Sequence, residues 1–245
     1  MSVSAIPLPA SGQVHLWLAS EPAPLAVDLQ QRYSTWLSSD EQQRMQRFHF
    51  AVDQQRFLLA RALVRSVLGT YLQQEPQSLR FVCNAHGKPE LKREAAGLSL
   101  SFNLSHTQGL LALAVTQNAD IGVDVEAVTR TVDMLALAER FFAPAETAQI
   151  KHCAADRQRD CFFGIWTLKE AYVKARGLGL QLGLDSFAFQ LDAADALVFS
   201  TPETGMEPSA WSFLQLHHAE HFRVAVAVHT GGLTLADMTV RTVTF

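Results

Sequence analysis

Two acidic residues stand at a spacing that could do chemistry in the segment IGVDVE, at 121–126. Its β-branched residues and strict alternation predict a strand, in which Asp124 and Glu126 point to the same face because they are two positions apart. Two buried carboxylates of like charge repel each other, and ionising both is costly without a cation. The pair alone fits a metal site or simply an edge strand that faces water.

A second segment, WTLKEAYVKARGLGL at 166–180, predicts a helix that runs into a glycine-rich loop. Glu170 and Lys174 are one turn apart on a shared face, which by itself favours an exposed salt bridge worth only about 0.3–0.5 kcal/mol. Together with Asp124 and Glu126, they would form three carboxylates and an ammonium. Mg²⁺ is usually held by a few carboxylates and by substrate phosphate oxygens, so this set predicts a cation and phosphate site.

Two further segments offer groups that could bind phosphate. In NAHGKP, at 84–89, a glycine turn presents the ammonium of Lys88. In FNLSHT, at 102–107, Ser105 and His106 bring a hydroxyl and an imidazole to the end of a predicted strand. They do not form a catalytic pair, because adjacent strand residues point to opposite faces. Taken singly, these segments are better explained by a solvated lysine and a structural histidine.

Composition and charge exclude several classes of protein. The chain has 245 residues, of which 48% are hydrophobic and 18% charged, and these values are typical of a globular protein. A net charge of −4 gives no basic field for nucleic acid. The sequence shows no secretory signal and no apolar run of about 18 residues, so we expect a cytoplasmic protein with no membrane partner. Cys83, Cys153 and Cys161 lack metal-binding spacing and are expected to be free thiols.

The elements that must position these residues alternate between helices and strands. The clearest helix covers 53–72, with Arg56, Arg61 and Arg65 off its apolar stripe. Residues 109–117 and 119–126 predict a β-hairpin. Helical patterns are also expected over 28–48, with a helix start at Ser38–Ser39–Asp40–Glu41 inside that range, and over 134–142, 144–151 and about 160–176. Strands are expected over 14–20, 80–83, 98–104, 187–192, 211–217 and 222–229.

Both halves follow a similar order of strand, helices and antiparallel strands. We therefore expect an α+β fold with a pseudo-duplicated architecture, in which each half is an antiparallel sheet packed with helices. The predicted halves are an N-terminal one, 1–118, and a C-terminal one, 119–245, that carries the metal site.

The motifs, taken in this order, closely resemble those of the Sfp-type 4′-phosphopantetheinyl transferases. The resemblance covers the chain from about Ser38 to His229. It is carried by DQQRFLLARALVRSVL (53–68), GKP (87–89), FNLSHT (102–107), IGVDVE (121–126), RFFAPAE (140–146) and WTLKEAYVKARGLGL (166–180).

The resemblance implies a 4′-phosphopantetheinyl transferase, an enzyme that moves the phosphopantetheine arm of coenzyme A onto a serine of an apo acyl or peptidyl carrier protein. The products would be the holo carrier protein and adenosine 3′,5′-bisphosphate. By likeness to the family, Asp124, Glu126 and Glu170 would hold Mg²⁺, with Mn²⁺ as an alternative. Glu170 and Lys174 would be the catalytic residues: the former as general base, the latter in contact with the pyrophosphate.

The family likeness also assigns contacts to coenzyme A as co-substrate and implies a monomer. The residues that would line its nucleotide are Arg56, Lys88, Ser105 and His106. One departure concerns the 3′-phosphate. Where some relatives carry a lysine, this chain reads Ser39–Asp40–Glu41, and Arg44 is the nearest matching cation.

Two other functions use the same residues. A Mg²⁺-dependent hydrolase of nucleotide diphosphates would direct the acids at water and need no carrier protein. A binding module with a silent site would hold coenzyme A or the carrier without turnover, although Asp124, Glu126, Glu170 and Lys174 are all present, which argues against a decayed site.

Overall fold

The computed structural model describes residues 6–22, 24–92, 99–191, 197–232 and 237–245. It divides into two compact units. Unit 1 consists of Met1–Cys83, Pro89–Asn118 and Asp237–Phe245, and unit 2 consists of Asn84–Lys88 and Ala119–Ala236. The expected halves, 1–118 and 119–245, differ from this division at two places: the turn 84–88 belongs to unit 2, and the C-terminal strand belongs to unit 1.

Unit 1 is built on a four-stranded sheet in the order β11-β1-β5-β4. The strands are β1 (Gln13–Ser20), β4 (Leu100–Thr107), β5 (Leu110–Gln117) and β11 (Asp237–Val243). β11 pairs with β1 in parallel, whereas β1–β5 and β5–β4 are antiparallel, so the sheet is mixed and not purely antiparallel as expected. A separate two-stranded ribbon joins β2 (Phe81–Cys83) to β3 (Pro89–Leu91).

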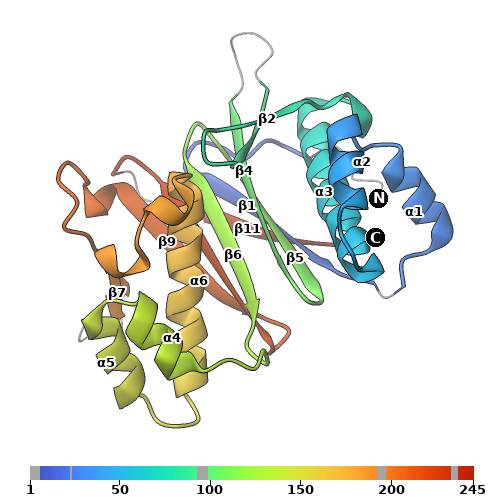
Figure 1. The fold of residues 1–245 in the computed structure, drawn as a ribbon. Coiled ribbons are helices and arrows are strands. Elements are labelled where there is room, and N and C mark those ends of the chain that lie inside the picture. Colours follow the sequence, from blue (N-terminus) through green and yellow to red (C-terminus); the bar gives the residue numbers. More distant parts are fainter. Residues whose placement is uncertain (1–5, 23, 93–98, 192–196, 233–236) are drawn as a thin grey trace. The chain divides into compact units, whose positions relative to one another are not determined.

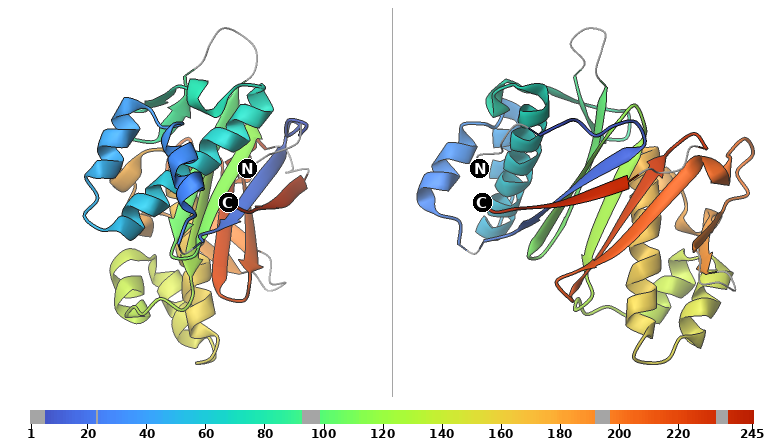
Figure 2. Two further views of the ribbon diagram at one scale, coloured as in Figure 1. Left: turned by 90° about the vertical axis from the view of Figure 1, so that its right-hand side faces the viewer. Right: turned by 180° about the vertical axis from the view of Figure 1, so that it is seen from behind.

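The helices of unit 1 lie on one face of this sheet, with the long helix α3 against β4 and β5 (Figures 1 and 2). They are α1 (Val27–Ser34), α2 (Ser39–Gln46), α3 (Ala51–Leu72) and the short η1 (Pro76–Ser78). The helical pattern over 28–48 forms two helices, and the second begins at the predicted start within it. Ser38 ends the break between them as the N-cap of α2, because its hydroxyl accepts a hydrogen bond from the backbone of Glu41.

Unit 2 is built on a three-stranded antiparallel sheet in the order β6-β10-β9. Its strands are β6 (Ile121–Ala127), β9 (Trp211–His218) and β10 (Phe222–His229). Helix α6 (Gln158–Arg176) lies across β6 and β10, and α4 (Met134–Phe141) and α5 (Pro144–His152) gather beside its N-terminal half (Figure 1). The smaller elements are β7 (Ala188–Leu191), β8 (Leu197–Ser200), η2 (Gly179–Gln181), η3 (Leu184–Ser186) and η4 (Pro208–Ala210).

The hairpin expected from 109–117 and 119–126 does not form. β5 is an inner strand whose two edges are taken by β1 and β4, so it has no edge to offer β6. The backbone adopts a left-handed conformation at Asn118, and β6 then pairs with β10 in the other sheet. The backbone N–H of His229 donates to the carbonyl of Asp120, one residue before β6 begins.

Two of the three cysteines are not free thiols, contrary to the expectation from their spacing. Cys153 and Cys161 form a disulfide, and Cys83 is exposed and free. Cys153 follows the end of α5 and Cys161 lies in the first turn of α6, so the connection between the helices brings the two sulfurs together. Across the described ranges, no helix is both long and apolar enough to cross a membrane.

Candidate active site

Strand β6 places its two acids as its alternation predicts. Asp124 lies opposite Ala225 and Glu126 opposite Arg223 in the register with β10, so the two carboxylates share a face. Val125, between them, is fully buried in the core on the other face. Asp124 is only 4% exposed and Glu126 is half-buried, so the strand does not simply present them to water.

Gly122 sets how closely α6 approaches β6. A methyl group at this position would overlap the backbone of Ala171 and Ala175 in α6. Only glycine therefore lets the helix turn that carries Lys174 lie directly against the strand that carries Asp124. Sequence reasoning missed this role, although a glycine inside a strand pattern is a signal of close backbone approach.

The ammonium of Lys174 lies against Asp124. Its Nζ is 2.6 Å from Asp124 Oδ1, and the two side chains are 29% and 6% exposed. This ion pair joins the strand to the helix, and Lys174 also lowers the pKa of Glu170 by its charge. This places the single predicted cation of the site at the more buried of the acids.

The negative charge of Asp124 acts on both Glu170 and Glu126. Burial raises the pKa of the Glu170 carboxyl, the negative charge of Asp124 raises it further, and Lys174 opposes the rise. Burial and Asp124 raise the pKa of Glu126 in the same way, against the opposing effect of Arg130, whose Nη1 is 3.2 Å from Glu126 Oε1. Asp124 therefore repels each of the two glutamates, and the three acids are called the carboxylate patch below.

The donor chemistry of this patch fits a hard divalent cation, because all three side chains offer oxygen atoms and their repulsion would be relieved by positive charge. The ligand set is not drawn together as it stands. In the part of the chain that the structure describes, no cluster of three or more histidine, cysteine or acidic side chains has the arrangement of a metal site. Asp124 is instead neutralised by Lys174.

The turn 84–88 holds the beginning of β6 and the end of α6 together. Lys88 Nζ donates to the carbonyls of Ile121 at 3.0 Å and Ala175 at 2.9 Å. Asn84 Nδ2 donates to the carbonyl of Gly177, the left-handed residue that ends α6, at 3.1 Å. The structure thus gives Lys88 a backbone-pinning role that the sequence did not predict.

The remaining predicted residues lie in unit 1. Arg56, on α3, pairs through Nε with Glu21 at 3.0 Å and through Nη1 with Asp53 at 3.4 Å. On β4, Ser105 is buried and His106 is exposed, as their opposite faces require. The structure therefore brings Asp124, Glu126, Glu170, Lys174 and Lys88 together in unit 2, and it places Arg56, Ser105 and His106 in unit 1.

A surface cavity of about 710 Å³ lies along α2 in unit 1. Its lining residues are Asp40, Gln43, Arg44, Arg47 and Phe48. The guanidinium of Arg44 also stacks over the ring of Phe57 on α3, 5.8 Å from its centroid. Two arginines at one cavity make it a candidate for an anionic group.

Comparison with known proteins identifies the family. Residues 23–118 match the family model for the 4′-phosphopantetheinyl transferase N-terminal region, and residues 120–227 match that of the 4′-phosphopantetheinyl transferase superfamily. The chain is 38% identical over 218 residues to the 4′-phosphopantetheinyl transferase HetI of Nostoc sp., covering 89% of this chain and 88% of that protein. It is 30% identical over 181 residues to the 4′-phosphopantetheinyl transferase Sfp of Bacillus subtilis, covering 74% and 78%.

Among solved structures, the holo-(acyl-carrier-protein) synthase of Thermotoga maritima is 25% identical and aligns with a TM-score of 0.37, over 44% of this chain and 61% of that chain. The chain belongs to the 4′-phosphopantetheinyl transferase superfamily. It is an enzyme of this class, and the resemblance found in its motifs is confirmed.

Proposed function

We propose that this transferase moves the 4′-phosphopantetheine arm of coenzyme A to a serine of an apo acyl or peptidyl carrier protein and releases adenosine 3′,5′-bisphosphate. The observation that carries the proposal is the carboxylate patch of Asp124, Glu126 and Glu170 with Lys174 at its buried end. Phosphoryl-type transfer needs positioning and charge neutralisation more than covalent help, and this set of side chains is suited to both.

Asp124, Glu126 and Glu170 are the proposed ligands of Mg²⁺, with Mn²⁺ as an alternative. A bound divalent cation would neutralise the diphosphate of coenzyme A and act as a Lewis acid on it. Asp124 would be the central ligand, because its charge acts on both of the other acids.

Lys174 would contact the pyrophosphate. The side chain of Lys174 is 29% exposed. Its flexible stem would let the ammonium also contact an anion that binds at the carboxylate patch.

Glu170 is the proposed general base for the carrier serine. A serine hydroxyl is a weak nucleophile and needs a base within hydrogen-bond reach. The burial that raises the pKa of Glu170 makes its ionised form a stronger base than an exposed carboxylate. The proposed step is removal of the hydroxyl proton by Glu170 as the serine oxygen attacks the phosphorus that carries the pantetheine arm. The bond from that phosphorus to the bridging oxygen breaks, and adenosine 3′,5′-bisphosphate leaves with that oxygen.

The nucleotide of coenzyme A is the proposed ligand of Arg56, Lys88, Ser105 and His106, on the strength of the family likeness. Arg44, with Arg47 beside it at the cavity along α2, supports a contact to the 3′-phosphate. In this proposal Arg44 would take the role that a lysine nearer the start of the helix has in some relatives.

Intact-protein mass spectrometry of several apo carrier proteins tests the proposal. Incubation with this protein, coenzyme A and Mg²⁺ should add the mass of one phosphopantetheine to a carrier. The gain should vanish with a chelator, with a carrier whose serine is changed to alanine, and with Asp124→Ala. Consumption of coenzyme A with no gain would favour the hydrolase, and binding without either would favour the silent module.

The same preparation tests two further predictions. Size-exclusion chromatography with light scattering should give the mass of a monomer. Fractionation of the source cells should place the protein in the cytoplasm.

A further inference from the structure

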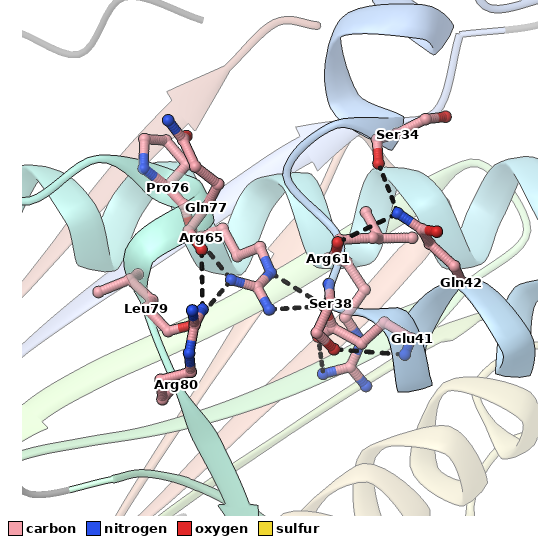
Figure 3. A network of polar contacts seen from close by, with 11 residues as sticks. Ser34, Ser38, Glu41, Gln42, Arg61, Arg65, Pro76, Gln77, Leu79 and Arg80 are labelled. Carbon is pink, nitrogen blue, oxygen red and sulfur yellow. Dashed lines mark hydrogen bonds and ion pairs between the residues drawn. The ribbon is translucent and has the colours of Figure 1, made fainter.

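The carboxylate of Glu41, on helix α2, bonds to helix α3. Glu41 Oε2 accepts hydrogen bonds from both Arg65 Nη2 at 2.6 Å and Arg65 Nε at 3.0 Å, and the charges on both partners strengthen these bonds. The other carboxylate oxygen faces Arg61 Nη1 at 3.8 Å. Figure 3 shows both arginines reaching from α3 toward Glu41.

Arg65 is almost completely buried, although it lies off the apolar stripe that the sequence predicts for this helix. Its Nη1 donates to the carbonyls of Pro76 at 2.9 Å and Leu79 at 3.0 Å (Figure 3). A buried guanidinium is tolerated only where its hydrogen bonds and charge are matched. The guanidinium therefore joins α2, α3 and the segment around η1 at one defined geometry.

The same carboxylate also starts α2. The backbone N–H of Ser38 donates to Glu41 Oε2 at 3.0 Å, and Ser38 Oγ accepts from the backbone N–H of Glu41 at 3.3 Å. This capping box fixes the first turn of an eight-residue helix whose side chains are all at least partly exposed. Met45 packs this helix against the core, and Glu41 fixes both its first turn and its ion pair with α3.

The placement of α2 fixes the positions of the residues that line the cavity. Arg44 is three residues beyond Glu41, nearly one turn along the helix, and Arg47 is its C-cap. Both line the cavity of about 710 Å³. A helix that is loosened at Glu41 would therefore spread the positions of both guanidinium groups.

We propose that Glu41, locked by Arg65, is a positioning residue for recognition of the coenzyme A 3′-phosphate by Arg44. The proposal rests on the proposed function, since it takes coenzyme A as the ligand. Glu41 does not touch the phosphate, because its charge would repel one. It acts by holding the helix that carries Arg44.

The test compares coenzyme A with dephospho-coenzyme A, which lacks only the 3′-phosphate. Isothermal titration calorimetry with Glu41→Gln should give a dissociation constant for coenzyme A about tenfold higher, which corresponds to the coupling energies of residues in one network. The constant for dephospho-coenzyme A should change less than twofold. KM for coenzyme A should rise and kcat should stay nearly unchanged.

A matched control is Glu139→Gln. Glu139 is a helical glutamate paired with Lys151 at 2.6 Å, but the pair is about half exposed and lies in unit 2. It should leave both constants unchanged. Arg65→Lys keeps the charge but loses the fork, and it should reproduce the selective loss of Glu41→Gln.

A double-mutant cycle separates positioning from general loosening. In an Arg44→Gln background, Glu41→Gln should have almost no further effect on coenzyme A binding, because the group that it positions is gone. An additive effect, an equal loss for both ligands, or no loss in Glu41→Gln would overturn the proposal. Failure of the wild-type protein to modify any carrier would instead overturn the proposed function, which the mass measurement decides separately.

Discussion

Gly122→Ala should move the acid on α6, Glu170, away from the acids on β6, Asp124 and Glu126. The added methyl group would overlap backbone atoms of Ala171 and Ala175. Backbone cannot rotate away as the end of a side chain can, so α6 must move from β6. That movement carries Glu170 and Lys174 away from Asp124.

The expected magnitude follows from the overlap. Overpacking of a core by one or a few carbon atoms typically costs about 1–3 kcal/mol, and a clash with two backbone segments belongs at the upper end of that range. About 3 kcal/mol should lower the melting temperature by roughly 6–12 °C for a chain of this size. A displacement of about 1 Å in catalytic groups can cost about a hundredfold in rate.

The assay measures carrier modification under saturating coenzyme A and thermal unfolding by circular dichroism. Gly164→Ala is the control, because Gly164 lies in the same helix and an added Cβ would meet only the side chain of Gln215, at 3.4 Å. That variant should keep full activity and gain stability from the better helix former. Full activity and an unchanged melting temperature in Gly122→Ala would refute the assigned role of the glycine.

Three further predictions concern the charged groups of unit 2. Lys169→Met should lower the free energy of unfolding by about 3–5 kcal/mol in chemical denaturation, because it leaves the charge of Glu146, its fully buried partner at 2.7 Å, without a counter-charge. The double variant Lys169→Met with Glu146→Leu should regain most of that loss. In metal-free protein, NMR titration should find the pKa values of Glu126 and Glu170 above their ordinary range, and Asp124→Asn should lower both. Because the raised pKa values make the native wild-type protein bind more protons than the unfolded chain, the free energy of unfolding contributed by Glu126 and Glu170 should fall as the pH rises from their unfolded to their native pKa. An unchanged titration of both glutamates in Asp124→Asn would contradict the assigned coupling. Glu170→Gln should reduce kcat much more than it weakens coenzyme A binding by calorimetry, whereas equal losses would indicate a positioning role.

The local part of the site could be predicted from the sequence, because it depends on short-range geometry. Alternation in IGVDVE was sufficient to put Asp124 and Glu126 on one face, and the structure confirms that arrangement. Gly177 ends α6 in the left-handed conformation, as its place after the helical pattern predicts. Neither inference needs to know what the strand or the helix packs against.

The nonlocal part could not be predicted. The adjacent sequence of β5 and β6 suggests a hairpin, but the pairing depends on β1 and β4 occupying both edges of β5. The burial of Arg65 likewise depends on α2 and η1 covering its side of α3. A residue's periodicity says which way it points, but only the remaining elements decide whether it meets water or another charge.

The sequence predicts Lys88 as a residue of the site, and the structure gives it a contact that the sequence did not predict. A lysine in a glycine turn suggests a phosphate ligand, yet its Nζ bonds the carbonyls of Ile121 and Ala175. Those carbonyls belong to the start of β6 and the end of α6, which Gly122 brings into contact. The turn therefore helps to fix the distance between the strand with the acids and the helix with Lys174. Any loss of coenzyme A binding on changing Lys88 must accordingly be judged against the same backbone shift that Gly122→Ala produces.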